Sequence, residues 1–216
     1  MLNESKALEL SKGINKFLNN TIITPNSNDN FLVNDWKNSG ISDETINRYI
    51  SEGYLKTTFD GWELTFPELF ENKKSNYWTK RLKEPKESKY IRPKGETSRL
   101  FRPLEIAPEC LNNADDYVIV VEGEKKSIKA AQEGFNCIAV VGVWCFRGKT
   151  KDGLIPDMHK INWKNKTVYL CFDTDVKEKP QVKQALCAFV EVLQDKGAIV
   201  KDLDLTLVEE FKNYGK

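Results

Sequence analysis

Two short, uninterrupted apolar runs, 117–121 and 167–172, constrain the fold of this chain more than any other feature. Both are rich in β-branched and aromatic residues and are short, which is typical of strands buried on both faces of a parallel sheet. Acidic residues follow each run at once, Glu122 after the first and Asp173 and Asp175 after the second. Because ligands bind at the carboxyl ends of strands in open parallel sheets, the sequence predicts that these acids meet at one functional edge.

The segments around the two runs alternate between strand-like and helix-like patterns. Segments 137–141 and 198–205 are further short apolar strands, whereas 125–134 and 181–196 carry apolar residues at the spacing of three and four that a helix face requires. Strands that alternate with helices favour a parallel sheet. We therefore predict that residues 114–210 form an α/β domain in which helices flank a parallel sheet.

Three carboxylates at one sheet edge would repel one another unless a cation lies among them. Because all of the donor atoms are oxygens, the favoured ion is Mg²⁺ or Mn²⁺. Asp173 and Asp175 point the same way in an extended segment, so both can face one ion, which would bind phosphate oxygens. The alternatives are an exposed turn glutamate at 122 and an acidic pair at a helix N-terminus.

The residues at these strand ends resemble a known family. Glu122-Gly123, then Gly142-Val143-Trp144, then Asp173-Thr174-Asp175 are similar to the Toprim domain of primases, topoisomerases and some nucleases. The finer pattern resembles the Toprim-like domain of uncharacterised plasmid and phage replication proteins, over roughly residues 36 to 205. The resemblance implies a Toprim-like (Rossmann-like) sheet, with Glu122, Asp173 and Asp175 as catalytic groups and ligands of Mg²⁺ or Mn²⁺.

The chain departs from the family pattern in two places. Many Toprim primases and topoisomerases carry an acid where this chain has Lys126, and the replication-protein branch tends to end in a Lys-Gly-x-Asp-Asp-like segment that is absent here. Lys125, Lys126 and Arg147 are candidates for phosphate contacts, with plain solvent exposure as the alternative. Glu124 fits a solvated residue at a helix start, and we expect Trp144 to pack.

The first part of the chain has helical patterns. Segment 2–19 carries a rough apolar stripe, segment 31–38 is expected to form a short helix, and Ser42 is a good N-cap for a third helix that Gly53 ends. We expect the apolar face of this third helix to consist of Ile46, Tyr49 and Ile50. Residues 1–54 are therefore predicted to form a helical N-terminal cap.

Residues 55–106 are predicted to form a small, basic, mostly antiparallel β subdomain, because segments 62–67, 77–82, 88–93 and 98–102 read as short strands. Between positions 73 and 102 there are eleven basic residues but only three acids. Basic side chains neutralise phosphates and aromatic faces stack on bases, so we expect contact with nucleic acid; the alternative is a solvated face over an aromatic core. The candidates for this contact are Lys80, Arg81, Lys89, Arg92, Arg99 and Arg102.

Composition excludes several classes of protein. No apolar run approaches the roughly 20 residues of a membrane helix, and the polar first residues do not resemble a secretory signal. There are five cysteines without a Cys-x-x-Cys pair and one histidine, which argues against a structural zinc site. We expect a cytoplasmic protein without a membrane partner, in which Cys137, Cys171 and Cys187 are small core residues.

Three functions remain open from the sequence. The first is a metal-dependent nucleotidyl transferase of the primase type, which requires nucleoside triphosphates and a single-stranded DNA or RNA template, with a replicative helicase as the candidate protein partner. The second is a Toprim nuclease that uses the same acids. The third is a non-catalytic nucleic-acid-binding protein in replication or defence. The first of these would build short primers for a plasmid, phage or mobile element.

Overall fold

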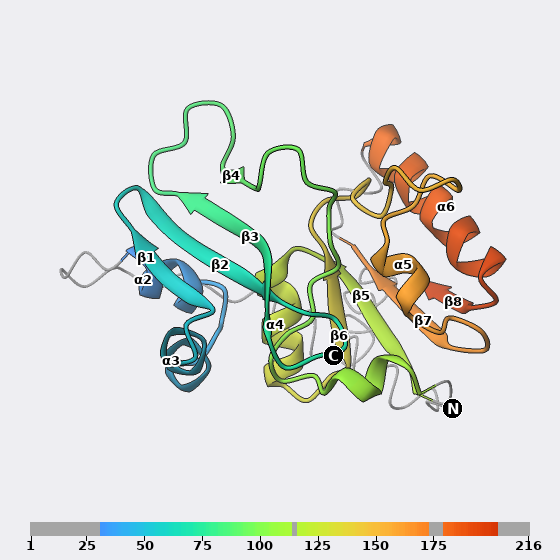
Figure 1. The fold of residues 1–216 in the computed structure, drawn as a ribbon, viewed down its shortest axis with the longest axis horizontal. Coiled ribbons are helices and arrows are strands. Elements are labelled where there is room, and N and C mark those ends of the chain that lie inside the picture. The colour runs from blue at the N-terminus through green and yellow to red at the C-terminus, as the bar shows by residue number, and fades with distance from the viewer. Residues whose placement is uncertain (1–30, 114–115, 173–178, 203–216) are drawn as a thin grey trace, which may run out of the picture.

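Two four-stranded sheets organise the protein in the computed structural model, which describes residues 31–113, 116–172 and 179–202 (Figure 1). The first sheet is antiparallel, in the order β1-β2-β3-β4, and the second is parallel, in the order β6-β5-β7-β8. Helices precede the first sheet and alternate with the strands of the second. The predicted fold class, a parallel sheet flanked by helices after a helical and antiparallel part, is confirmed.

The antiparallel part differs from the prediction in two strands: β1 was not predicted, and the strand predicted over 98–102 does not form. Segment 88–93 contributes only a two-residue strand, and 98–102 contributes a single bridge at Phe101. The unpredicted strand β1 has the sequence Leu-Lys-Thr-Thr, which carries too little alternation to be recognised from its own residues. The elements are Phe31–Lys37 (α2), Asp43–Ser51 (α3), Leu55–Thr58 (β1), Gly61–Pro67 (β2), Lys74–Leu82 (β3) and Tyr90–Ile91 (β4).

Helix α3 begins as the sequence predicts, because the Ser42 hydroxyl accepts a hydrogen bond from the N–H of Thr45 at 3.2 Å. Ile46 and Tyr49 are buried, but the prediction for Ile50 is wrong, since this side chain is 42% exposed. Helix α3 packs on β1 and α2, and the Tyr49 hydroxyl also accepts a hydrogen bond from the N–H of Leu104, whereas Ile50 lies off this buried face.

The parallel part follows the predicted alternation closely. Two short helices, η1 and α5, lie in connections where no helix was predicted. The elements are Pro108–Leu111 (η1), Val118–Glu122 (β5), Glu124–Gln132 (α4), Cys137–Val140 (β6), Asp157–Lys160 (α5), Thr167–Cys171 (β7), Pro180–Asp195 (α6) and Ile199–Asp202 (β8).

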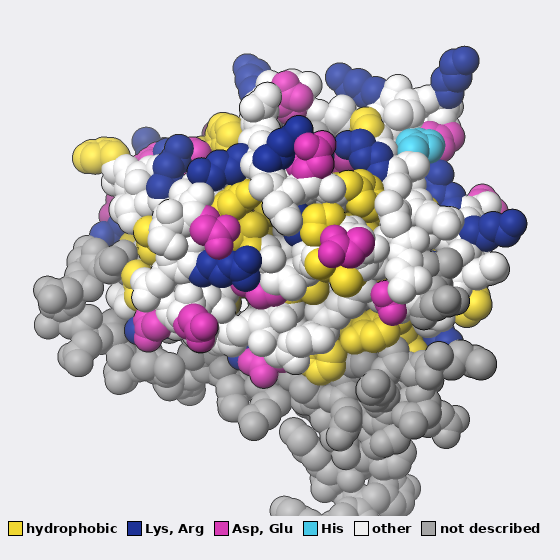
Figure 2. Space-filling view, turned by 60° about the horizontal axis from the view of Figure 1, so that its bottom comes forward, with side chains coloured by type: hydrophobic (Ala, Val, Ile, Leu, Met, Phe, Trp, Pro, Cys, Tyr) yellow, Lys and Arg dark blue, Asp and Glu magenta, His cyan; other side chains and the backbone are white. Residues whose placement is uncertain are grey.

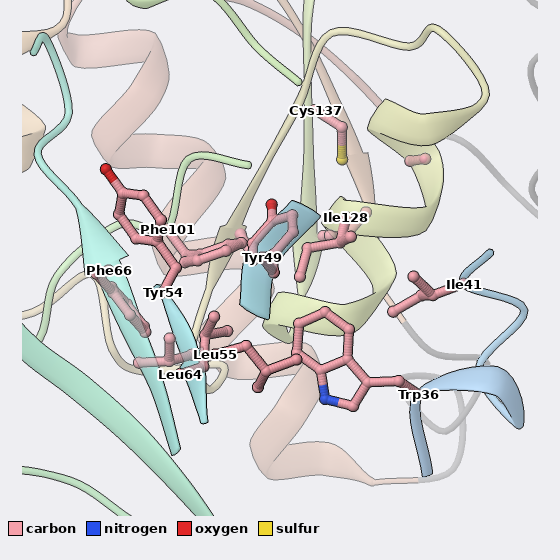
Figure 3. Packing of buried hydrophobic residues seen from close by; sticks show 14 of the residues in the cluster. Trp36, Ile41, Tyr49, Tyr54, Leu55, Leu64, Phe66, Phe101, Ile128 and Cys137 are labelled. Atoms are coloured by element: carbon pink, nitrogen blue, oxygen red, sulfur yellow. The ribbon is translucent and has the colours of Figure 1, made fainter. Parts of the chain in front are cut away.

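The parallel sheet separates two apolar cores because its side chains alternate between faces. Val118 and Val120 point into the core that contains Phe189 of α6. Ile119 and Val121 point into the other core, which also holds residues of α2, α3, α4 and the antiparallel sheet. In Figure 3 the indole of Trp36 on α2 lies toward Ile128 on α4.

The core that contains Ile119 and Val121 thus draws residues from all three predicted units, 1–54, 55–106 and 114–210. The boundaries between these units stay a proposal from the sequence. The predicted helix in 2–19 and the end of the strand predicted over 198–205 lie outside the described residues.

A β-bridge joins the segment that follows β4 to β6 of the parallel sheet. The N–H of Phe101 donates to the carbonyl of Ala139 at 2.9 Å, and the N–H of Ala139 donates back at 2.9 Å. Phe101 thereby lies along the outer edge of β6, and its ring packs edge-on against Phe66 of β2 at 4.9 Å between centroids. The antiparallel sheet is therefore attached to the strand next to β5.

Cys137 and Cys171 are buried, as predicted, but Cys187 is exposed. Ala185 and Phe189 form the buried side of α6, and position 187 lies on the opposite side of the helix. No helix in the described part of the chain is long and apolar enough to cross a membrane.

Candidate functional site at the carboxyl edge of the parallel sheet

Glu122 is the last residue of β5 and lies half-buried at the carboxyl edge of the parallel sheet. It pairs with Val140 of β6, while Val121 pairs with Cys171 of β7. Gly123 follows with a φ of 98°, a conformation that favours glycine, and its N–H donates to the carbonyl of Val140 at 2.9 Å. This turn lets α4 start directly at the strand end, so Glu122 stays at the edge where β6 and β7 also end.

Asp173 and Asp175 lie outside the described residues, so the structure places only Glu122 of the three predicted metal ligands. Among the described residues, no group of three or more His, Cys, Asp and Glu side chains could hold a metal ion. The chain enters Asp173-Thr174-Asp175 directly after β7, the neighbour of β5. The oxygen donors and the adjacent strand ends fit a divalent cation, and this metal site stays a prediction.

Glu124, the first residue of α4, is only 6% exposed, so the expectation of a solvated residue is wrong. Its Oε1 has no hydrogen-bond partner among the described residues. The Glu124 carboxylate also affects Tyr90 on β4: burial raises the pKa of Tyr90 to about 12, and the Asp35 and Glu124 carboxylates make smaller contributions. A buried acceptor without a partner is costly, so this oxygen is suited to a donor on a ligand. In the sequence, the position of Glu124 two residues after Glu122 was the signal that could have indicated this role.

Lys125 is used within the structure. Its Nζ lies 2.9 Å from Oδ2 of Asp35 on α2, and the same oxygen accepts a hydrogen bond from Trp62 Nε1 at 2.9 Å. Burial lowers the pKa of Lys125, and the Asp35 carboxylate opposes that shift. Lys125 therefore holds α4 against α2, which argues against the predicted phosphate contact, while the contact of half-buried Lys126 stays a prediction.

Arg81, Lys89 and Arg92 lie around β4, and Arg92 also reaches the carboxyl end of β6. Arg92 Nη2 donates to the carbonyl of Val141, directly after β6, at 2.6 Å. The Arg81 guanidinium and Lys89 Nζ lie 5.6 Å and 5.9 Å from the centre of the Tyr90 ring. The Nε atoms of Arg81 and Arg92 are buried without a hydrogen-bond partner among the described residues. We call Arg81, Lys89 and Arg92 the edge cations.

The other predicted nucleic-acid contacts have partners within the chain. Lys80 forms an ion pair with Asp60 at the end of the β1–β2 hairpin. Arg99 lies 2.8 Å from Glu68 and 3.2 Å from Asp157, and these hydrogen-bonded carboxylates raise its pKa. These ion pairs largely neutralise the charges of Lys80 and Arg99, which argues against a role for the two residues in binding nucleic acid.

Arg102 is 1% exposed, and its burial argues against the predicted contact with nucleic acid. Its guanidinium donates to the carbonyl of Ile106, to that of Glu68 at 3.2 Å and to that of Glu71 at 3.1 Å. Burial lowers the pKa of Arg102. Arg102 is therefore a structural group that ties two loops together.

The loop after β6 carries an exposed aromatic and an exposed cation. Trp144 packs on Phe146, as expected, but is still 42% exposed, and the guanidinium of Arg147 lies 5.1 Å from the ring centre of Phe146. The predicted phosphate contact of Arg147 stays a prediction.

Figure 2 shows one face of the molecule, on which Lys and Arg side chains gather along the upper part and alternate with acidic ones.

Comparison with known proteins gives a family match and a fold. Residues 110–212 match the model of a domain of unknown function, DUF3854. The structure of the DnaG primase catalytic domain bound to ssDNA is similar, with 16% identity, a TM-score of 0.50, and coverage of 91% of this chain and 72% of that one. A structure of the DnaG catalytic core gives the same identity and TM-score, with 91% and 70% covered. No curated protein matches the chain.

At this identity the likeness shows the fold alone, because one fold supports many functions. The chain therefore shares its arrangement of two sheets with the DnaG primase catalytic core. Its activity has to be argued from its own residues.

Proposed function

We propose that the protein is a metal-dependent nucleotidyl transferase of the primase type that acts on single-stranded nucleic acid. The observation that carries this proposal is the strand end at Glu122, which lies beside the strand that leads into Asp173-Thr174-Asp175. The similar fold of a DnaG catalytic domain that was bound to ssDNA supports the proposal.

Each group at this edge has a proposed task. Glu122, Asp173 and Asp175 hold Mg²⁺ or Mn²⁺, and the ion, when bound, would neutralise charge on the reacting phosphate. The edge cations neutralise phosphates of the template strand, because Arg92 reaches the end of β6 and, among the described residues, none of the three forms an ion pair like that of Arg99. Nucleoside triphosphates are then the second substrate, and a replicative helicase is a plausible partner in supplying single strands.

The direct test incubates the protein with single-stranded DNA, labelled nucleoside triphosphates and Mg²⁺ or Mn²⁺, and separates the products by length. We expect labelled products that grow, and only when both metal and nucleotides are present. The double variant Asp173→Asn/Asp175→Asn should make none, because it keeps the side-chain volumes but removes two ligand charges.

Two other outcomes would contradict the proposal. Shortening of the DNA without nucleotides would show a nuclease that uses the same acids. Intact DNA and no products, with DNA binding retained in the double variant, would show a non-catalytic binding protein.

The edge cations give a prediction about salt. For single strands, log affinity falls with log salt, and the loss of one phosphate contact makes this negative slope shallower by about 0.7. Lys89→Ser should therefore weaken binding and make this slope shallower by about that amount, as measured by fluorescence anisotropy with labelled oligonucleotides. Lys73→Ser is the matched control, since Lys73 is exposed but pairs with Glu71 before β3. Equal slopes for the two variants would remove Lys89 from the interface.

A further inference from the structure

The loop that follows β6 holds an aromatic stack with one open end. The rings of Phe146 and Phe189 stack at 4.6 Å between centroids and 22° between planes, and Trp144 stacks on Phe146 at 6.0 Å and 24°. Phe146 and Phe189 are 0% and 1% exposed, whereas Trp144 is 42% exposed. The stack therefore begins in the core beside α6 and ends in an indole that solvent reaches.

Backbone contacts fix the loop in place. The N–H of Cys145 donates to the carbonyl of Gly142 at 2.8 Å, and the N–H of Arg147 donates to that of Trp144 at 3.0 Å. The N–H of Ile155 reaches the carbonyl of Phe146 at 3.0 Å and closes the base of the loop. These bonds hold the backbone that carries Trp144, and stacking on Phe146 orients its ring, so less order has to be imposed when a ligand binds.

The loop also begins at the edge that carries the proposed site. Val140 at the end of β6 is the strand partner of Glu122, and Gly142 starts the loop two positions later. Exposed cations follow Trp144 in the same loop, at Arg147, Lys149 and Lys151. A flat apolar ring with cations alongside matches a ligand that is flat at one end and anionic at the other.

We propose that Trp144 is a stacking platform for a nucleobase at the carboxyl edge of the parallel sheet. Aromatic side chains bind single strands in this way, because every base offers a π-face, while neighbouring cations take the phosphates. The inference deepens the proposed function and rests on it, since it names the group that receives a base of the strand or of a nucleotide.

The test uses the fluorescence of Trp144 and its substitution together. Trp36, Trp62 and Trp163 are at most 3% exposed, so a ligand that quenches tryptophan emission by stacking acts chiefly on Trp144 or on half-buried Trp78. A thymidine homopolymer should quench the parent and a Trp78→Phe control but not Trp144→Phe.

Affinity separates stacking from a structural role. Trp144→Ala should lower affinity for the homopolymer about five- to 150-fold, the factor that corresponds to one base–aromatic stack. Trp144→Phe should restore most of that loss, and the salt slope should stay that of the parent, because no phosphate contact is removed. A titration with dTTP in metal-free buffer, run beside the homopolymer, distinguishes a free nucleotide from a strand as the source of the base.

The outcomes divide cleanly. If the parent binds the homopolymer and Trp144→Ala binds equally well with equal quenching, the inference is wrong and the proposed function stands. If the parent binds neither homopolymer nor nucleotide, the proposed function itself is wrong and the inference goes with it.

Discussion

Arg102→Met should destabilise the protein by about 3–5 kcal/mol, although this arginine has the sequence context of a nucleic-acid contact. The guanidinium is buried and donates to the carbonyls of Ile106, Glu68 and Glu71. Methionine has a similar volume but no donor, so these buried acceptors lose their partner. For a chain of this size the loss corresponds to roughly 6–20 °C in melting temperature.

The matched control is Arg147→Met, because Arg147 is exposed and forms a cation–π contact with Phe146. This change should alter the free energy of unfolding by no more than about 0.5–1 kcal/mol. Thermal melting of both variants in one buffer checks the prediction. Similar melting temperatures for the two would show that the buried hydrogen bonds of Arg102 contribute little.

Glu122→Gln should lower any nucleotidyl-transfer activity by at least about a hundredfold while leaving stability nearly unchanged. Glutamine preserves the volume of the side chain, and position 122 is half-buried at a strand end, so no cavity opens. The lost charge, however, is one of the proposed metal ligands. Glu122→Gln should therefore lower activity and leave stability nearly unchanged, whereas Arg102→Met should lower stability.

Melting with and without Mg²⁺ connects that loss to the ion. A ligand that binds only the folded protein raises its melting temperature, so the parent should gain stability on adding Mg²⁺ and Glu122→Gln should gain less. Glu109→Gln, which changes an acid of η1, serves as the control and should behave like the parent. If Glu122→Gln melts several degrees lower in metal-free buffer, its carboxylate is a structural partner of buried groups, and the catalytic role has to be abandoned.

The parallel sheet could be predicted from the sequence because its strands are marked by their own residues. The run Val118 to Val121 is apolar on both faces, and the structure buries both faces. The turn at Gly123 likewise fixes Glu122 at the strand end. These are local properties of the sequence, so the sequence alone predicted both the strands and the position of Glu122 at the edge of the sheet.

The basic surface could not be predicted in the same way, because local charge does not show which cations have partners. One of the two carboxylates that pair with Arg99 is Asp157, far along the chain on α5. The acceptors of Arg102 are carbonyls, which no sequence pattern announces. Only the fold separates these structural arginines from the edge cations. The roles of Asp173 and Asp175 still depend on the sequence.

The bridge between Phe101 and Ala139 has a consequence for how this domain can be inherited. The family match begins at residue 110, so it leaves out the segment that pairs with the outer edge of β6. Taken alone, that region would present unpaired backbone groups along β6 and the bare apolar face of Ile119 and Cys137, which invites aggregation. A gene fusion that transplants this half must therefore bring a replacement cover, and recombination is expected to respect a unit larger than the recognised domain.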